Sequence, residues 1–584
     1  MAVRGAHPAV TRHELLGVGL WSLLVTAMAS VPYVIGWARG TDAAPFVGML
    51  NYWQADTAYH LSFARQAAEG QLLFENKYLG GAATGPAIFN LLFLGIGLVA
   101  RVLAVSLPVA FNLVRALSAC ALLCFAYLLA ARVFAGRGLR WLALILASFS
   151  SGLGWLAMLG LGRNHESCDL WLIEVSTFWA IRWEVVVPPV VALLLLVFYL
   201  AGRYIDTARQ RFAIGAGAAM LLLAAVHPHD VLTASIVIVL ALLARVLWGR
   251  LRGPAADGRA GACRVGEVVK GGLWMLLPVA PLMAYHLRVL LDVPGYGQYV
   301  RIVDPLSAPQ LLSGFGLMAL LGIAGAAIAV RDRRWGCDLC VLWAVTGCVL
   351  AFIPVPPFHQ VYTLHGVHVA LCILSVVAVE RLVAQSASWG RWRRRALLVI
   401  GLALLPLTAL TNALHYANEI VLLRGSARVP FPHRDLTAAL EWFCAHTLGG
   451  RPGCAASPYY LPGEILEVTS WLARETQGDE TVLALPGVGI LLPYLVGARV
   501  LLPMEDQPGY AERLEVVERF FDSSRPGAAG ERAAFLRKEG VSWVLIDRAL
   551  PQSDGTALEP ALQEIPGLSK AYADSRFAVY RYVP

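Results

Sequence analysis

The chain has 584 residues, of which 58% are hydrophobic and only 15% carry a charged side chain. Together with a mean hydropathy of +0.62, this composition excludes a soluble globular protein and predicts a polytopic α-helical membrane protein. The formal net charge is +8, and the excess of Lys and Arg lies entirely before Asn418. Because that part is the apolar one, we interpret the excess as a signal of membrane orientation. Membrane lipids are then expected as partners, and nucleic acid is not.

Apolar segments long enough to cross a bilayer recur from Leu15 to about Ala417 and then stop. The predicted spans, about eleven transmembrane helices, are 15–37, 107–131, 141–161, 185–200, 212–226, 231–247, 271–291, 311–330, 339–353, 367–383 and 396–416. The further apolar segment 86–105 is interpreted as a helix along the outer face, because counting it as a span would reverse every later loop. The first span is expected to be an anchor and not a cleaved signal.

With a cytoplasmic N-terminus, this count places every arginine-rich connection inside the cell, as the positive-inside rule requires. These connections are 132–140, 203–211, 245–264, 331–334 and 391–395. We therefore expect a multi-pass protein of the plasma (inner) membrane, with a membrane domain over 1–417 and an extracytoplasmic domain over 418–584. The outer loops of the membrane domain are then 37–106, 162–184 and 354–366.

The first outer loop carries the strongest candidate group, in the segment DTAYH. Asp56, Tyr59 and His60 have the spacing of residues on one face of a helix. A carboxylate, a phenol and an imidazole at a membrane surface suit proton abstraction or cation binding. The alternative interpretation is that Asp56 only caps a helix that begins near Thr57.

Other ionisable residues are expected on the same side of the membrane. Asp169 and Glu174 lie in the second outer loop among interfacial aromatic residues, His227 and His229 lie in the run HPHD, and His365 lies in the third outer segment. A one-sided concentration of such groups in a membrane protein indicates a functional site. The spacing of the two HPHD histidines suits neither a helical metal pair nor a zinc finger, so no metal-ligating residue is assigned. The imidazoles are candidates for contacting a phosphate or for hydrogen bonds at a helix end. No organic cofactor is predicted, and a divalent cation is left open.

The part from Asn418 onward has the composition of a small α/β domain. The predicted strands are 481–487, 499–502, 541–547 and 577–583. The predicted helices are 436–444, 464–475 and 532–538. Their alternation favours a largely parallel sheet. The segment has no glycine-rich phosphate loop and no nucleophile elbow, so it is expected to be a lid or a recognition module. Cys444 and Cys454, its only cysteines, could form a disulfide in an oxidising compartment.

The order of these features resembles the GT-C superfamily of integral-membrane glycosyltransferases. The resemblance covers the architecture of most of the chain, and the residue that carries it most firmly is Asp56 in DTAYH. It implies a catalytic role for Asp56, with Asp169 or Glu174 as the second acid. The Asp-Glu pair of protein mannosyltransferases and aminoarabinose transferases is missing, since Thr57 follows Asp56. The WWD motif of oligosaccharyltransferases is missing from the C-terminal part, so no subfamily is identified.

The resemblance further implies a hexosyl- or pentosyltransferase that uses a polyprenyl-phosphate-linked sugar donor, with inversion, on the extracytoplasmic face. The acceptor is a lipid, a glycan or a protein. Asp56 would be the general base, with Tyr59 and His60 beside it. The residues expected to contact the phosphate are Arg65, Lys77, His227, His229 and His365. Two non-catalytic alternatives are a transporter or flippase of lipid-linked glycans and an envelope scaffold. Transporters usually contain internal repeats, and the sequence shows none.

Overall fold

The computed structural model of the chain describes residues 10–50, 54–79, 85–161, 167–251, 265–292, 306–353, 360–386, 390–392, 395, 399, 406–425, 429–432, 434, 436–438, 440–441, 459–477, 479–502, 509–522, 529–550 and 555–584. The chain divides into two compact units. The first unit comprises 1–31, 113–287 and 302–416, and the second comprises 32–112, 288–301 and 417–584.

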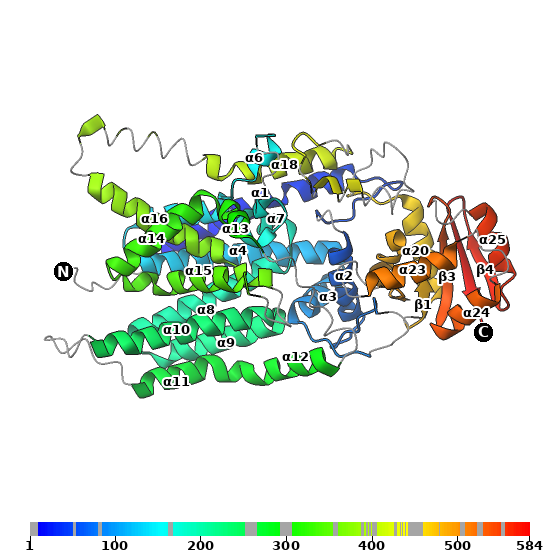
Figure 1. Cartoon of the computed structure of the whole chain (residues 1–584), viewed down its shortest axis with the longest axis horizontal. Helices are drawn as coiled ribbons and strands as arrows, with labels where there is room; N and C mark the ends of the chain where they lie inside the picture. Colours follow the sequence, from blue (N-terminus) through cyan, green and yellow to red (C-terminus); the bar gives the residue numbers. More distant parts are fainter. Residues whose placement is uncertain are drawn as a thin grey trace. The chain divides into compact units, whose positions relative to one another are not determined.

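The first unit is helical throughout its described residues (Figure 1). The elements wholly or partly within it are α1 (Arg12–Arg39), α4 (Leu107–Val133), α5 (Arg137–Phe149), α6 (Trp155–Met158), η1 (Cys168–Leu170), η2 (Ile173–Val175), α7 (Thr177–Trp183), α8 (Val187–Thr207), α9 (Gln210–Val226), α10 (His229–Leu251), α11 (Val265–Leu276), η3 (Leu277–Val279), α12 (Ala280–Asp292), α13 (Ala308–Phe315), α14 (Leu317–Arg331), η4 (Trp335–Cys337), α15 (Asp338–Leu350), η5 (Gln360–Leu364), α16 (Val367–Ser386) and α18 (Leu410–Leu423).

Within the described residues, six helices are long and apolar enough to cross a membrane. They are Arg12–Arg39, Leu107–Val133, Val187–Thr207, His229–Leu247, Val265–Asp292 and Gln360–Ser386. The pair α13 and α14 would make a seventh, although it is bent by 94°. The chain is therefore a polytopic, mainly helical membrane protein. Shorter apolar helices occupy other predicted spans, and the predicted span 396–416 lies partly outside the described residues.

The predicted span 141–161 is wrong in its second half. Helix α5 ends at Phe149, and Ser150 adopts an extended backbone conformation. The sequence explains this ending, because Ser150 to Gly154 read SSGLG, and serine and glycine favour non-helical backbone. The chain resumes only as the single turn α6.

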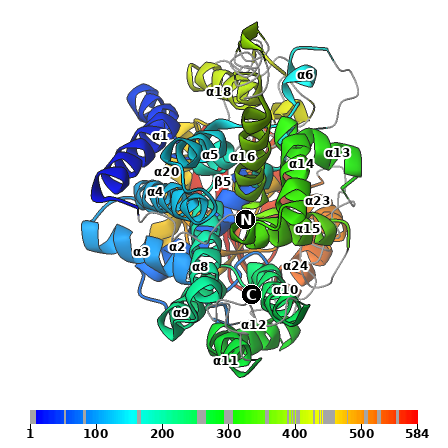
Figure 2. The same ribbon diagram turned by 90° about the vertical axis from the view of Figure 1, so that its left-hand side faces the viewer.

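Close helix contacts define two groups in the first unit. Helices α8, α9, α10 and α11 pack against one another, and α14 packs along α16 (Figure 2). At the second contact Gly325 faces the backbone of Leu374 so closely that a Cβ would overlap it. Small residues at such points allow helices in a membrane to approach without a gap.

The second unit contains a five-stranded sheet and its covering helices. Its elements are α2 (Gln54–Ala68), α3 (Leu91–Leu103), α20 (Gly463–Glu475), β1 (Thr481–Leu483), α21 (Pro486–Gly489), α22 (Leu492–Leu495), β2 (Arg499–Val500), α23 (Tyr510–Phe521), α24 (Ala529–Lys538), β3 (Val541–Asp547), α25 (Gly555–Gln563), β4 (Leu568–Ala573) and β5 (Phe577–Tyr582). The strand order is β2-β1-β3-β5-β4. Strands β2, β1 and β3 are parallel, whereas β5 and β4 run antiparallel to their neighbours. The prediction of a largely parallel sheet is therefore wrong for its C-terminal half.

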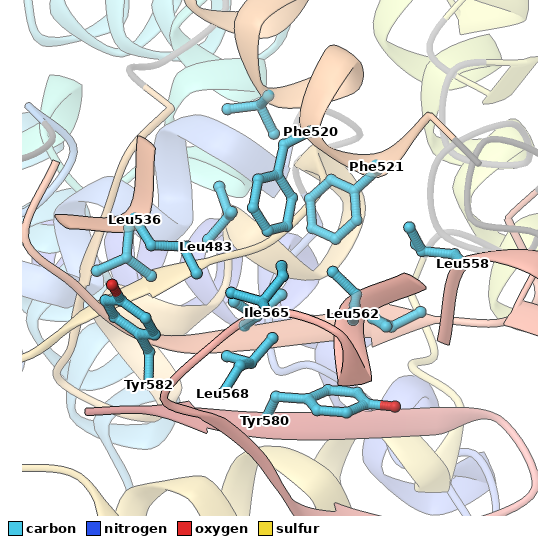
Figure 3. Close-up of a cluster of buried hydrophobic side chains, with 14 of the residues drawn as sticks. Leu483, Phe520, Phe521, Leu536, Leu558, Leu562, Ile565, Leu568, Tyr580 and Tyr582 are labelled. Carbon is cyan, nitrogen blue, oxygen red and sulfur yellow. The ribbon is translucent and has the colours of Figure 1, made fainter. Parts of the chain in front are cut away.

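The central strand β3 is buried on both faces of the sheet. Alternate residues of β3 point to opposite sides, so that Trp543 and Leu545 join one apolar cluster and Val544 and Ile546 join another. The second cluster includes side chains of α23, α24 and α25, and Figure 3 shows Phe520 and Phe521 against this face. Strands that are buried on both faces are continuous apolar runs, which is the pattern of VSWVLID. Cys444 and Cys454 lie outside the described residues.

The first-loop helix α2 belongs to this same unit. Ala58 of α2 and Tyr78, which follows the helix, are buried in the cluster that contains Trp543. Helix α3 packs on α2 so closely that Gly97 leaves no room for a Cβ, which would lie 2.5 Å from the carbonyl oxygen of Ala64. The predicted surface helix 86–105 is thus the shorter helix α3, packed on the helix that carries Asp56.

Candidate functional site

Asp56 lies in the first turn of α2 and is exposed. The helix begins at Gln54, so the interpretation of Asp56 as the cap of a helix starting near Thr57 is wrong. An acidic side chain in the first turn is favoured by the helix dipole. Asp56 therefore combines a favourable helical position with an exposed side chain.

Tyr59 and His60 are half-buried against other aromatic rings of the second unit. The Tyr59 ring lies 4.7 Å from that of Phe63 and 5.5 Å from that of Tyr78. His60 stacks on Phe93 of α3, with ring centroids 5.0 Å apart. These contacts fix the face of α2 next to Asp56, and the assignment of both residues to substrate binding stays a prediction.

Arg65 and Lys77 contact α22 and the residues that follow it. The Arg65 guanidinium donates to the carbonyl oxygens of Tyr494 at 3.1 Å and Leu495 at 2.7 Å. Lys77 is buried and donates from Nζ to the carbonyl oxygen of Gly497. Burial lowers the pKa of Lys77. Both cations thus attach α2 and the segment after it to α22 and the turn before β2. Their assignment to a phosphate stays a prediction.

Asp169, in the first unit, is fully buried in η1. Its carboxylate accepts hydrogen bonds from the backbone N–H of Gly152 at 2.9 Å and of Gly154 at 3.1 Å, and from the hydroxyl of Ser167. Burial raises the pKa of Asp169 to about 6. These contacts hold the irregular segment after α5, so the Asp169 carboxylate has a structural role.

Glu174 has different surroundings from Asp169. Its Oε1 lies 3.9 Å from Nε2 of His365, and the two side chains are 8% and 1% exposed. Burial raises the pKa of Glu174. On the other side of the same ring, Nδ1 of His365 lies 3.0 Å from Oδ2 of Asp230, which is 1% exposed. An imidazole is therefore held between two buried carboxylates.

Asp230 also pairs with the first histidine of the HPHD run. Oδ2 of Asp230 lies 2.5 Å from Nδ1 of His227. The Tyr362 ring stacks on His365 and meets His227 edge-on, with centroids 5.5 Å and 4.8 Å apart. His229 lies beside them, with its ring centroid 5.1 Å from that of His227. We call His227, Asp230, His365 and Glu174 the imidazole–carboxylate cluster.

Local sequence explains how these side chains are positioned. Helix α9 ends at Val226 and α10 begins at His229, and Pro228 between them suits a helix start. Gly366 has a φ of +71°, and a Cβ at this position would overlap the Trp343 ring. Only glycine therefore fits the turn that separates η5 from α16 and presents His365.

The structure thus brings His227, His229, His365 and Glu174 of the predicted residues together. It also adds two residues that were not assigned to the site, Asp230 and Tyr362. Asp230 was visible as the last residue of HPHD, and Tyr362 precedes His365 by three residues. Among the described residues, His227, Asp230 and His365 form the group whose ligand atoms lie close enough, within 4.8 Å of one another, to hold a metal ion. The cluster has groups that could bind a cation or donate N–H groups to an anion.

No protein-family model matches the sequence, and no curated protein matches it either. Several solved structures are similar in fold, among them the following two. One is the oligosaccharyltransferase of Archaeoglobus fulgidus tethered to an acceptor peptide, with a TM-score of 0.50, 12% identity and coverage of 98% of this chain and 74% of that one. The other is the arabinofuranosyltransferase AftD from Mycobacteria, with a TM-score of 0.53, 15% identity and coverage of 99% of this chain and 40% of that one. This chain thus spans about two fifths of the length of AftD. The fold that the resemblance implies is therefore confirmed.

Proposed function

We propose that this chain is a membrane glycosyltransferase that moves one sugar from a polyprenyl-phosphate donor to an acceptor on the extracytoplasmic face. The fold shared with two glycosyltransferases supports the general activity. The observation that carries the assignment of the base is the exposure of Asp56 on a helix that is otherwise anchored in the second unit. A general base must be accessible and must also be held in place.

In the proposed step, the Asp56 carboxylate takes the proton of the acceptor hydroxyl as its oxygen attacks the anomeric carbon. The bond between that carbon and the phosphate oxygen breaks, and polyprenyl phosphate leaves with the electron pair. One displacement inverts the configuration of the sugar. The protein needs no nucleophile of its own, because the donor already carries its leaving group.

We assign His227, His229 and His365 to the binding of the donor phosphate, either directly through imidazole N–H groups or through a cation that they hold. Of the two acids in the second outer loop, we favour Glu174 as the functional one. Glu174 contacts His365, whereas the carboxylate of Asp169 accepts hydrogen bonds from Gly152 and Gly154. This assignment and that of Asp56 concern different units and are tested separately.

The activity is tested with purified protein and a labelled polyprenyl-phosphate sugar. We expect free polyprenyl phosphate to appear only when an acceptor is present, and Asp56→Asn to abolish its release while the melting temperature stays unchanged. Asp42→Asn is the matched control, because Asp42 is an exposed acid of the same loop. Near-normal turnover in Asp56→Asn would rule out the base. Movement of the labelled lipid across the bilayer without bond cleavage would support a flippase instead.

We further propose about eleven spans, a cytoplasmic N-terminus and an extracytoplasmic segment 418–584 in the plasma membrane. The arginine-rich connections support this orientation. Single cysteines at the exposed positions Ser569 and Thr207, in a background without Cys444 and Cys454, provide the test. A membrane-impermeant maleimide should label position 569 but not position 207 in intact cells, and the reverse pattern would overturn the orientation.

A further inference from the structure

We propose that His227, Asp230 and His365 bind a divalent transition-metal ion of the zinc class, and that Glu174 is the carboxylate that orients His365. The inference concerns ion binding and does not require glycosyl transfer. Only the suggestion that the ion's open position takes a phosphate oxygen rests on the proposed function.

The first observation is that two imidazole nitrogens converge on one carboxylate oxygen. Oδ2 of Asp230 lies 2.5 Å from Nδ1 of His227 and 3.0 Å from Nδ1 of His365. Zinc takes nitrogen and oxygen ligands at about 2.0–2.2 Å, so ligand atoms around one ion stand about 3–3.5 Å apart. The three ligand atoms lie within 4.8 Å of one another, so movements of about 1–2 Å would bring them to that spacing.

The second observation is the charge balance of the cluster. Asp230 and Glu174 are both buried, and in the described part of the chain their ion-pair partners are imidazoles and no lysine or arginine. Buried carboxylates are unfavourable without a compensating charge. If the imidazoles are neutral, as metal ligands must be, a divalent cation balances the two carboxylates.

The third observation concerns the far nitrogen of His365. Nε2 is buried, has no hydrogen-bond partner among the described residues, and lies 3.9 Å from Oε1 of Glu174. A histidine that ligates a metal through one nitrogen commonly donates from the other to a carboxylate, which fixes the tautomer and the ring orientation. Glu174 is in the position to accept that hydrogen bond once the ring settles on an ion.

The donor set indicates the class of metal. Two imidazoles and one carboxylate form the protein ligand set of one class of catalytic zinc site, whereas Mg²⁺ prefers oxygen ligands alone. The three residues come from two segments, the α9–α10 turn and the η5–α16 turn. The spacing of His227 and His229 on its own therefore did not reveal a site.

Metal content and zinc affinity of the full-length protein in detergent, prepared without a polyhistidine tag, test the proposal. We expect about one zinc ion per chain by mass spectrometry, and a rise in melting temperature when zinc is returned to chelator-treated protein. Asp230→Asn and His227→Gln should each abolish stoichiometric binding. Glu174→Gln should retain the ion with affinity about 10- to 100-fold weaker, as expected for an orienting carboxylate.

Two controls separate this site from other sources of binding. His286→Gln removes a histidine outside the cluster and should leave affinity unchanged. Cys337→Ser removes one thiol of the CxxC pair Cys337 and Cys340 and should also leave the zinc affinity unchanged. For the same reason, the Co²⁺-loaded protein should show no thiolate charge-transfer band. Absence of zinc binding, or binding that survives both Asp230→Asn and His227→Gln, would overturn the proposal. Because no sugar donor is used, failure of the metal site and failure of the proposed transfer are distinct outcomes.

Discussion

The guanidinium of Arg499 in β2 holds the carboxylate of Glu75 through two hydrogen bonds, of 2.8 Å from Nε and 3.2 Å from Nη2. Glu75 lies in the segment after α2, where its backbone N–H and carbonyl oxygen also bond to Gln66. The backbone N–H of Val500 donates to the carbonyl oxygen of Lys77 at 2.9 Å. The segment after the helix of Asp56 is therefore bonded directly to the edge of the sheet.

This ion pair gives the first prediction. Glu75→Gln should destabilise the protein by about 1–3 kcal/mol, because a paired, mostly buried guanidinium loses a charge-assisted partner. Arg499→Lys should have a similar effect, since lysine cannot form the two parallel hydrogen bonds. Thermal unfolding in detergent measures both. The double variant should lose less stability than the sum of the losses in the two single variants. Strictly additive losses of stability would contradict a direct interaction.

The contact between α2 and α3 gives a second prediction. In Gly97→Ala the new Cβ would lie 2.5 Å from both the carbonyl oxygen of Ala64 and the Cβ of Ala67, so α3 must shift. We expect a loss of about 1–3 kcal/mol in stability, as for other overpacked contacts. Gly95→Ala is the control, because a Cβ there meets nothing within 4 Å. Equal melting temperatures for the two variants would show that the helices are not tightly packed.

Gly366 gives a third prediction, on the presentation of His365. Gly366→Ala should lower stability by about 1–3 kcal/mol and weaken zinc binding, because the added Cβ combines a positive φ with overlap of the Trp343 ring. Gly425→Ala separates the two causes. Gly425 has a φ of +89°, but a Cβ there meets nothing within 4 Å. Gly425→Ala should therefore lose less stability than Gly366→Ala and keep the zinc affinity of the wild type.

Asp169 gives a prediction on pH. Burial raises its pKa from 3.8 to about 6, so between these values the native state keeps a proton that the unfolded chain has released. The contribution of this group to stability is therefore fully present below pH 3.8 and is lost as the pH rises through about 6.

Asp169→Asn removes this titration and places an amide NH₂ against the N–H groups of Gly152 or Gly154. We expect a loss of about 1–3 kcal/mol for the unsatisfied donors. The gap in melting temperature between wild type and variant should narrow between about pH 4 and pH 7. A gap that widens with pH would contradict the assignment.

Elements that consist of a long apolar run, such as strand β3, could be predicted from the sequence. Strand β3 has the predicted bounds Val541–Asp547, because an uninterrupted apolar run is typical of a strand buried on both faces. Strand β4 was not predicted, since Ser569 and Lys570 are exposed and Leu568 is its one fully buried residue. The antiparallel half of the sheet was missed for that reason.

Individual residues of the site could be predicted from the sequence, but the contacts between them could not. His227 and His365 were selected as ionisable groups, but their common partner Asp230 joins segments 135 residues apart. The assignment of Arg65 to a phosphate stays a prediction, but its hydrogen bonds to carbonyl groups 429 and 430 residues later were not predicted. Local spacing contains no information on such pairings, which depend on how distant segments pack.

The shared core of α2 and the sheet has a consequence for protein engineering. Ala58 and Tyr78 pack with Trp543 in one apolar cluster, so residues 32–112 and 417–584 fold as parts of a single unit. A chimera that exchanges only the C-terminal segment would join two mismatched half-cores and misplace the helix of Asp56. An exchange of this unit between homologous proteins therefore requires both segments to be transplanted together.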